Sequence, residues 1–182
     1  MKNNSIAIVI FSYKRPDSLQ RLIQDLLSQN YDISAIPVIL FQDNTNDSRK
    51  LPLVRNCIIN FQSSKIPIKI LRLRDKNFGL KKNVESGLNE VFKSYSRAII
   101  LEDDLRLSKT FLGTLLDLLI DYEEDKNVCS VTGMGIYGFE RKSRIRSKLT
   151  SSIGWGTWSD RWEKRTSNPL IILWFIFVKG RK

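Results

Sequence analysis

The stretch Ala98-Ile99-Ile100-Leu101-Glu102-Asp103-Asp104-Leu105 decides how the rest of the chain is interpreted. Its apolar half predicts a strand buried on both faces, as in a parallel sheet, and three carboxylates follow where that strand leaves the sheet. Adjacent carboxylates repel one another, so the cluster favours a cation between them and a ligand. Hard oxygen ligands suit Mg²⁺ or Mn²⁺, completed by phosphates and water. The alternative is an acidic helix start, with Ser108 capping a helix over 109–124; it explains one or two acids, but not three ahead of the cap.

The composition fits one soluble globular domain without histidine chemistry. The chain has 182 residues, of which 42% are hydrophobic and 27% charged, enough for a sizeable core. Because histidine is absent from the sequence, catalytic triads, metal sites and general bases that use an imidazole are excluded. Carboxylates are left to bind metal and to transfer protons. The two cysteines are far apart and give neither a disulfide framework nor a zinc spacing, which predicts a reducing cytoplasm.

The net charge of +11 predicts an anionic partner: a nucleotide, a phosphorylated lipid, a membrane surface or nucleic acid. The excess is uneven, because residues 140–182 hold eleven Lys or Arg against three Asp or Glu. We expect no secretory signal, and the apolar stretch 170–178 is too short for a membrane-spanning helix, which needs about 20 residues. These features predict a cytoplasmic protein, with peripheral contact to the anionic inner face of the membrane as a further expectation.

Apolar runs and helical periodicities alternate through residue 133, which predicts an α/β fold. The expected strands cover 6–11, 37–41, 66–73, 98–101 and 128–133. The expected helices cover 16–27, 48–63 with an interruption near Pro52, 80–95 and 109–124. This order predicts a Rossmann-like, mainly parallel central sheet with helices on both faces. No Walker-type loop and no Gly-x-Gly-x-x-Gly motif occurs, which disfavours kinases, GTPases and dinucleotide-binding enzymes.

Polar clusters follow several of these strands and would share one edge of the sheet. Arg15 lies in a strand-to-helix turn, where an anion-binding role and a solvated basic loop are equally good interpretations. Asp43 follows the second strand and suits either a nucleobase or ribose contact or an ordinary turn. Lys82 and Asn83 fall in the first turn of a helix, where a lysine opposes the helix dipole and so indicates an anion. Their convergence predicts a nucleotide-type site.

Three tryptophans lie within eight residues, at Trp155, Trp158 and Trp162. Indole faces are good platforms for the C–H faces of sugars, which makes Trp155 and Trp158 candidates for acceptor binding. The equally good alternative is that all three are core residues, with a helix starting near Thr157.

The chain resembles nucleotide-sugar glycosyltransferases of the GT-A fold, in particular the bacterial family 2 group, with later motifs similar to those of N-acetylglucosaminyltransferase I. The matching motifs occur in family order over residues 6–162: Ile8–Pro16, Phe41–Asp43, Asn77–Leu80, Leu101–Leu105 and Gly154–Trp158. The resemblance implies a glycosyltransferase domain over 1–165, followed by an apolar and basic tail over 166–182.

The resemblance also implies roles for individual residues. Asp104 would hold the divalent metal, Mn²⁺ or Mg²⁺, that bridges the donor diphosphate, while Asp103 would contact ribose or sugar hydroxyls and Glu102 the donor sugar. Asp43 would meet the nucleobase, with Arg15 nearby. Either Lys82 or Asn83 would face the donor. The donor, most simply a UDP-sugar, would pass its sugar with inversion to a saccharide or lipid-linked acceptor in the synthesis of a cell-surface polysaccharide or glycolipid.

The chain departs from the family pattern at its carboxyl end. Relatives carry a catalytic carboxylate downstream of the Trp-rich motif, whereas here Asp160 and Glu163 are the only late acids and are weak candidates for the base. This implies a C-terminally truncated member, and leaves a non-catalytic nucleotide-sugar-binding remnant as an alternative. A basic nucleic-acid-binding module is a further alternative, disfavoured by acids in the expected cleft; we expect no nucleic-acid partner.

Overall fold

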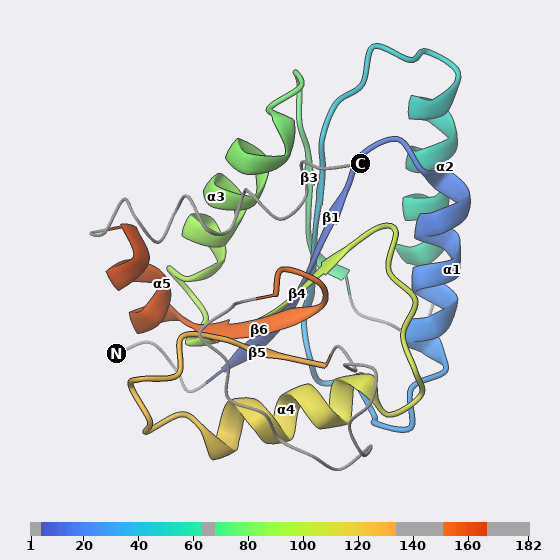
Figure 1. Ribbon diagram of the computed structural model, residues 1–182. Coiled ribbons are helices and arrows are strands. Elements are labelled where there is room, and N and C mark those ends of the chain that lie inside the picture. Colours follow the sequence, from blue (N-terminus) through green and yellow to red (C-terminus); the bar gives the residue numbers. More distant parts are fainter. Residues whose placement is uncertain (1–4, 63–67, 134–150, 167–182) are drawn as a thin grey trace.

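The computed structural model describes residues 5–62, 68–133 and 151–166, which form one α/β fold around a six-stranded sheet in the order β3-β2-β1-β4-β6-β5 (Figure 1). The strands are β1 (Ile6–Ser12), β2 (Val38–Gln42), β3 (Ile68–Leu73), β4 (Arg97–Glu102), β5 (Val131–Thr132) and β6 (Trp155–Trp158). The helices are α1 (Pro16–Leu27), α2 (Lys50–Gln62), α3 (Gly79–Val91), α4 (Phe111–Asp121) and α5 (Ser159–Thr166). The predicted α/β architecture, with a mainly parallel sheet and helices on both faces, is confirmed.

The two faces of the sheet bury alternate residues of the same strands, as the pleat requires. In β1, Ile8 and Ile10 pack with the apolar residues of α1, α2 and α4. On the other face, Val9 and Phe11 pack with α3 and α5, and the ring of Phe11 stacks on that of Phe41 from β2 at 5.3 Å. Burial on both faces explains the unbroken apolar runs of β1 and β4.

The connections place a topological switch point between β1 and β4. The strands β3, β2, β1 and β4 are parallel, and the chain first runs outward from β1 through β2 to β3. It then returns through α3 to β4 on the other side of β1. The loops that leave β1 and β4 therefore diverge at one point of the carboxyl edge, which is the usual ligand site of such sheets.

The strand β6 was not predicted, because the two glycines that flank Trp155 and the polar residues after Trp158 indicate a turn and a helix start. It pairs antiparallel with β4, from Arg97↔Trp158 to Ile100↔Trp155, and with the short β5. Helix α5 starts at Ser159, two residues after the expected Thr157. The predicted strand 128–133 is reduced to the two residues of β5.

Two helix predictions also need correction. Pro52 does not interrupt α2, because it lies in the first turn, where a missing backbone N–H leaves no hydrogen bond unmade. Ser108 does not cap α4, which begins at Phe111 without a side-chain cap from Thr110. Instead the Leu112 N–H donates to Gln29 Oε1, on the segment that follows α1, at 3.0 Å.

Residues 134–150, and residues 167–182 of the predicted tail, lie outside the described residues. Within the described ranges, no helix is long and apolar enough to cross a membrane.

Candidate active site at the carboxyl edge

The ends of β2 and β4 are joined to the end of β1 by backbone hydrogen bonds. The Asp103 N–H donates to Phe11 O at 3.0 Å, and the Asp43 N–H donates to Ser12 O at 2.9 Å. The first residues after β2 and β4 therefore flank β1 at the carboxyl edge of the sheet. This is the convergence that the sequence predicts.

Asp103 is the most buried member of the acidic triplet, with 4% of the residue exposed. Its Oδ2 accepts the Tyr13 N–H at 2.8 Å, and Arg15 Nη1 lies 3.4 Å from its Oδ1. Burial raises the pKa of Asp103, and the negative charges of Asp104 and Glu102 add to that rise; the hydrogen bond from Tyr13 and the charge of Arg15 offset it in part. Asp103 is thus a carboxylate that benefits from a nearby positive charge.

Asp104 is the accessible member of the triplet. Its Oδ2 accepts a hydrogen bond from Arg15 Nη1 at 2.6 Å, and the two side chains are 35% and 54% exposed. The Arg15 guanidinium therefore bridges both aspartates from the loop after β1. Because this cation is more than half exposed, solvent screens the pair and weakens it. Glu102, the last residue of β4, is half-buried.

Asp43 connects the loops after β2 and β3. It is 4% exposed, and its Oδ1 accepts the backbone N–H groups of Phe78 at 2.8 Å and Asn44 at 3.0 Å. The Asn77 amide donates to Tyr13 Oη at 3.0 Å, which joins the same loop to the one after β1. The loops after β1, β2 and β3 are thus tied together beside the acidic triplet.

The structure separates the two candidates at the start of α3. Asn83 is 3% exposed, and its Oδ1 accepts a hydrogen bond from Arg74 Nε at 3.0 Å. Lys82 is exposed, and its ammonium lies 5.3 Å from the centre of the Phe78 ring. Of the pair, Lys82 has the side chain accessible to an anion, whereas Asn83 positions Arg74.

Sequence reasoning missed Tyr13 and Arg74. The Tyr13 contribution is a backbone N–H, which carries no side-chain signal. The Arg74 guanidinium lies 5.1 Å from the centre of the Phe41 ring and 4.7 Å from that of Phe78, and Arg74 Nη2 donates to Ser86 Oγ at 3.0 Å. Its only sequence signal is a basic residue directly after a strand.

Trp155 and Trp158 lie in the core, with 4% and 2% of each residue exposed. The Trp158 Nε1–H donates to Leu119 O at 3.1 Å, so its polar atom is satisfied inside the protein. Neither indole presents a face to a sugar in this structure. The structure therefore favours the core interpretation of these tryptophans over the acceptor-binding one.

Asp160 and Glu163 lie at the opposite edge of the sheet from the triplet. Since β6 runs antiparallel to β4 and pairs Trp158 with Arg97, α5 starts at the amino end of β4. Six residues of β4 separate that level from Asp103, which corresponds to about 20 Å. In Figure 1 α5 lies to the left, while the chain leaves β4 to the right.

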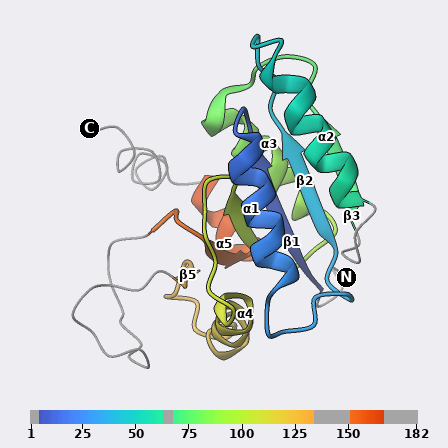
Figure 2. The ribbon, with the colours of Figure 1, turned by 90° about the vertical axis from the view of Figure 1, so that its right-hand side faces the viewer.

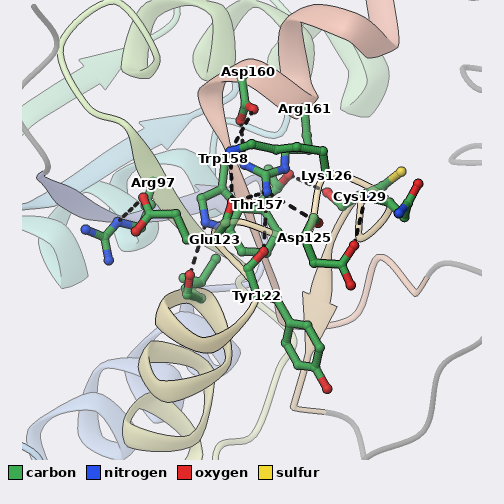
Figure 3. A network of polar contacts seen from close by, with 12 residues as sticks. Arg97, Tyr122, Glu123, Asp125, Lys126, Cys129, Thr157, Trp158, Asp160 and Arg161 are labelled. Carbon is green, nitrogen blue, oxygen red and sulfur yellow. Dashed lines mark hydrogen bonds and ion pairs between the residues drawn. The ribbon is translucent and has the colours of Figure 1, made fainter.

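Asp160 belongs to a network of polar contacts at this amino edge (Figure 3). Its carboxylate lies 2.8 Å from Arg161 Nη1 and 3.7 Å from Lys126 Nζ. Burial alone would raise the pKa of Asp160, but the hydrogen bond and charge of Arg161, together with Lys126, outweigh burial and lower it. Glu163 is exposed and lines a surface hollow of about 440 Å³ between α3 and α5. Neither acid is placed to act on a ligand at the triplet.

The triplet fits a divalent cation that a phosphate ligand helps to hold. Among the described residues, no three acidic or cysteine side chains converge closely enough to hold a metal alone. Mg²⁺ needs only one or two carboxylates when phosphates and water complete its shell. Asp104 offers an accessible carboxylate, and Arg15 demonstrates that a positive group is accommodated there.

The fold and site define a class: a doubly wound α/β domain with a cluster of acidic residues at its switch point. The sequence matches the profile of glycosyl transferase family 2 over residues 7–179, nearly its whole length. The chain belongs to glycosyl transferase family 2. No curated protein matches the sequence at a significant level.

Solved glycosyltransferases share this fold. S. aureus TarS 1–349 superposes with a TM-score of 0.65 at 13% identity, covering 93% of this chain and 53% of that one. The same protein in complex with UDP-GlcNAc gives 0.61 at 12% identity, covering 89% and 47%. The mannosyltransferase PcManGT from Pyrobaculum calidifontis, in complex with GDP-Man and Mn²⁺, superposes with a TM-score of 0.52 at 14% identity, covering 69% of this chain and 34% of that one. The chain thus spans about half the length of the TarS chain, or less, and these identities establish the fold alone.

Proposed function

We propose that this chain is the donor-binding domain of a metal-dependent glycosyltransferase that takes a sugar from a nucleoside diphosphate donor, most simply a UDP-sugar. The observation that carries the proposal is the meeting of Arg15, Asp103 and Asp104 at the β1/β4 switch point. Membership of glycosyl transferase family 2 supports the reaction class. The UDP-GlcNAc bound to TarS and the GDP-Man bound to PcManGT support a nucleotide-sugar donor.

Each residue at this edge has a distinct task in the proposal. Asp104 holds the cation, Mn²⁺ or Mg²⁺, and Asp103 with Glu102 contacts the ribose and donor sugar. When bound, the cation neutralises negative charge that develops on the departing diphosphate. Arg15 turns from the carboxylates to the nucleotide, which its 54% side-chain exposure permits.

The base of the donor rests in the proposal against the loops tied together by Asp43. A planar ring placed there meets Tyr13 from the loop after β1 and the loop that carries Asn77. Lys82 supplies a further positive charge at the start of α3. Asn83 acts indirectly, because it fixes Arg74.

The acceptor half of the reaction is a coarser proposal. By resemblance to the family, the acceptor is a saccharide or lipid-linked hydroxyl in the synthesis of a cell-surface polysaccharide or glycolipid, and transfer inverts the anomeric configuration. The basic excess of residues 140–182 suits an anionic membrane surface at the cytoplasmic face. The catalytic base is not assigned to Asp160 or Glu163, which lie at the other edge of the sheet.

A second candidate is a domain that binds the donor without transferring the sugar. The position of both late acids away from the triplet favours it. The two candidates differ only in turnover, and they predict the same donor site.

Calorimetric titration of the full chain with UDP, with and without Mn²⁺, tests the donor site. We expect binding in the presence of Mn²⁺ that is lost when EDTA is added. A UDP affinity that is the same with and without Mn²⁺, or no binding of UDP or GDP, would overturn the proposal. Release of free sugar from UDP-GlcNAc or UDP-glucose by the Mn²⁺-loaded chain then separates a transferase from a donor-binding remnant.

A further inference from the structure

The segment that follows the acidic triplet, residues 105–110, is fastened to α1 and its C-terminal end. Figure 2 shows it running alongside α1 down to the start of α4. The Gln29 amide donates to Ser108 O at 2.9 Å, and the Asn30 N–H donates to Lys109 O at 2.8 Å. The path of this segment is therefore set by tertiary contacts rather than by its own sequence.

Asp25, near the end of α1, contacts the part of this segment that is closest in sequence to the triplet. Its Oδ2 accepts the Leu107 backbone N–H at 3.0 Å and Arg106 Nε at 2.8 Å, while its Oδ1 accepts Arg106 Nη2 at 3.2 Å. The Asp25 side chain is 13% exposed and that of Arg106 is 67% exposed. Both hydrogen bonds to Arg106 form one bidentate, charge-assisted pair.

The two partners of Asp25 differ in what they hold. Arg106 is largely in solvent, so its ion pair contributes little by itself. The Leu107 N–H is a backbone group three residues after Asp104, and a carboxylate that accepts it fixes the chain itself. Asp104 itself lies within a turn that the Leu105 N–H closes by donating to Glu102 O, at the end of β4, at 3.2 Å.

We propose that Asp25 is a positioning residue for metal and donor binding: through Leu107 and Arg106 it fixes the end of the turn that presents the Asp104 carboxylate. This inference rests on the proposed function. Asp104 lies in an exposed turn between two anchors, Glu102 O on β4 and Asp25 on α1. Loss of the second anchor releases the backbone at Leu107, and the next hydrogen bond that holds the segment is the one from Gln29 to Ser108 O. The carboxylate then samples positions that do not meet the cation, as when an outer-sphere partner of a metal ligand is removed.

The test measures the affinity of the full chain for Mn²⁺ in the presence of UDP, from the electron paramagnetic resonance signal of free Mn²⁺. Asp25→Ala removes both contacts, and we expect about a 10-fold weaker affinity. Asp25→Asn keeps an oxygen for the Leu107 N–H but removes the negative charge that pairs with Arg106. Its Mn²⁺ affinity should therefore lie between those of Asp25→Ala and the wild type. This partial rescue distinguishes positioning of the backbone from loss of charge.

Two control variants isolate the effect. Asp117→Ala removes an exposed negative charge from α4, and Ile58→Val perturbs the buried side chain of α2. Both should retain the wild-type Mn²⁺ affinity, although Ile58→Val lowers the thermal unfolding midpoint. All titrations are made well below the midpoint of each variant.

A folded Asp25→Ala variant with wild-type Mn²⁺ affinity would overturn the inference, as would an equal loss in Ile58→Val. Should Asp25→Ala not fold, Asp25→Asn decides by the same criterion: weaker affinity supports the inference and wild-type affinity overturns it. If the wild type binds neither Mn²⁺ nor UDP, the proposed function fails and this inference fails with it.

Discussion

The two ends of β4 both gather acidic and basic side chains, but in opposite ways. At the carboxyl end, Asp103 and Asp104 share Arg15, whose side chain is 54% exposed. At the amino end, Arg161 pairs with Asp160 and is only 5% exposed. The guanidinium of Arg15 is thus accessible to solvent, whereas that of Arg161 is buried in the protein.

The partners of Arg161 explain the difference. Besides Asp160, its guanidinium donates to the backbone carbonyls of Tyr122 and Glu123 at the end of α4, and it lies 4.3 Å from the centre of the Trp158 ring (Figure 3). Tyr122 and Glu123 directly follow the last residue of α4, so the arginine completes the helix end. A cluster of acids thus indicates a ligand site only where a ligand can replace the cation that pairs with it. Of the two ends of β4, the carboxyl end has the exposed cation, Arg15.

Trp158→Ala should have the largest effect, and it acts on the amino end. Removing a buried indole that donates to Leu119 O should cost about 3–5 kcal/mol in the free energy of unfolding. Denaturant titration measures this cost. The fraction that remains folded should bind UDP and Mn²⁺ normally, and a stability loss below about 1 kcal/mol would contradict burial of this indole.

Asp104→Ala should have the next largest effect, and it acts on the carboxyl end. Loss of the carboxylate that we propose as a direct metal ligand should weaken Mn²⁺-dependent UDP binding by at least the roughly 100-fold seen when the strongest outer-sphere partners are lost. The unfolding midpoint should change little, because this side chain is 35% exposed. Asp160→Ala is the matched control and should bind like the wild type in calorimetry. Equal losses in both variants would remove the distinction between the two ends.

The two ends should also respond to pH with opposite sign. Burial raises the pKa of folded Asp103 above the ordinary 3.8, so its ionised form opposes folding at neutral pH and this penalty disappears as the pH falls through the raised value. Asp103→Asn should therefore leave stability at neutral pH unchanged or higher, with the difference vanishing near pH 3.

Asp160 behaves in the other direction, since Arg161 and Lys126 overcome its burial and lower its pKa below 3.8. Its contribution to stability is present above 3.8 and is lost as the pH falls through the lowered value. Asp160→Asn should therefore reduce stability at neutral pH, by well under about 1 kcal/mol because the pair is partly exposed. Urea titrations between pH 3 and 7 measure both differences, and the same sign for both variants would refute the account.

Arg15→Ala should have the smallest effect and should sharpen the comparison. Without the guanidinium, the nucleotide-free protein should bind Mn²⁺ more tightly, by less than about fivefold for a solvent-exposed pair. UDP affinity in the presence of Mn²⁺ should fall, because Arg15 then has no charge to offer the nucleotide. Mn²⁺ binding unaffected by this variant would mean that Arg15 does not compete for Asp104.

The parts of the fold predicted from sequence are those in which residues within one element carry the signal. The apolar runs of β1 and β4 and the triplet after β4 are local, and Pro16 marks the start of α1. The carboxyl ends of parallel strands lie at one edge of a sheet, so the edge that holds Asp43, Arg15 and the triplet was predictable as well.

What sequence reasoning missed depends on distant partners. The short strand β6 exists because β4 and β5 supply its hydrogen bonds. Gln29 completes the first turn of α4 from 83 residues away. Nothing in the sequence of β6 encodes its antiparallel direction. That direction accounts for the burial of Trp155 and Trp158 and for the position of Asp160 at the far edge of the sheet.

The central claim is that the donor diphosphate and its cation bind at the carboxyl end of β4. Anomalous scattering from Mn²⁺ in crystals grown with UDP tests it most directly. We expect a manganese peak at roughly 2.1 Å from an Asp104 carboxylate oxygen, with the diphosphate beside it and within reach of Arg15. A manganese ion and nucleotide bound beside Asp160 or Glu163, or a nucleotide bound away from both Asp104 and Arg15, would contradict it.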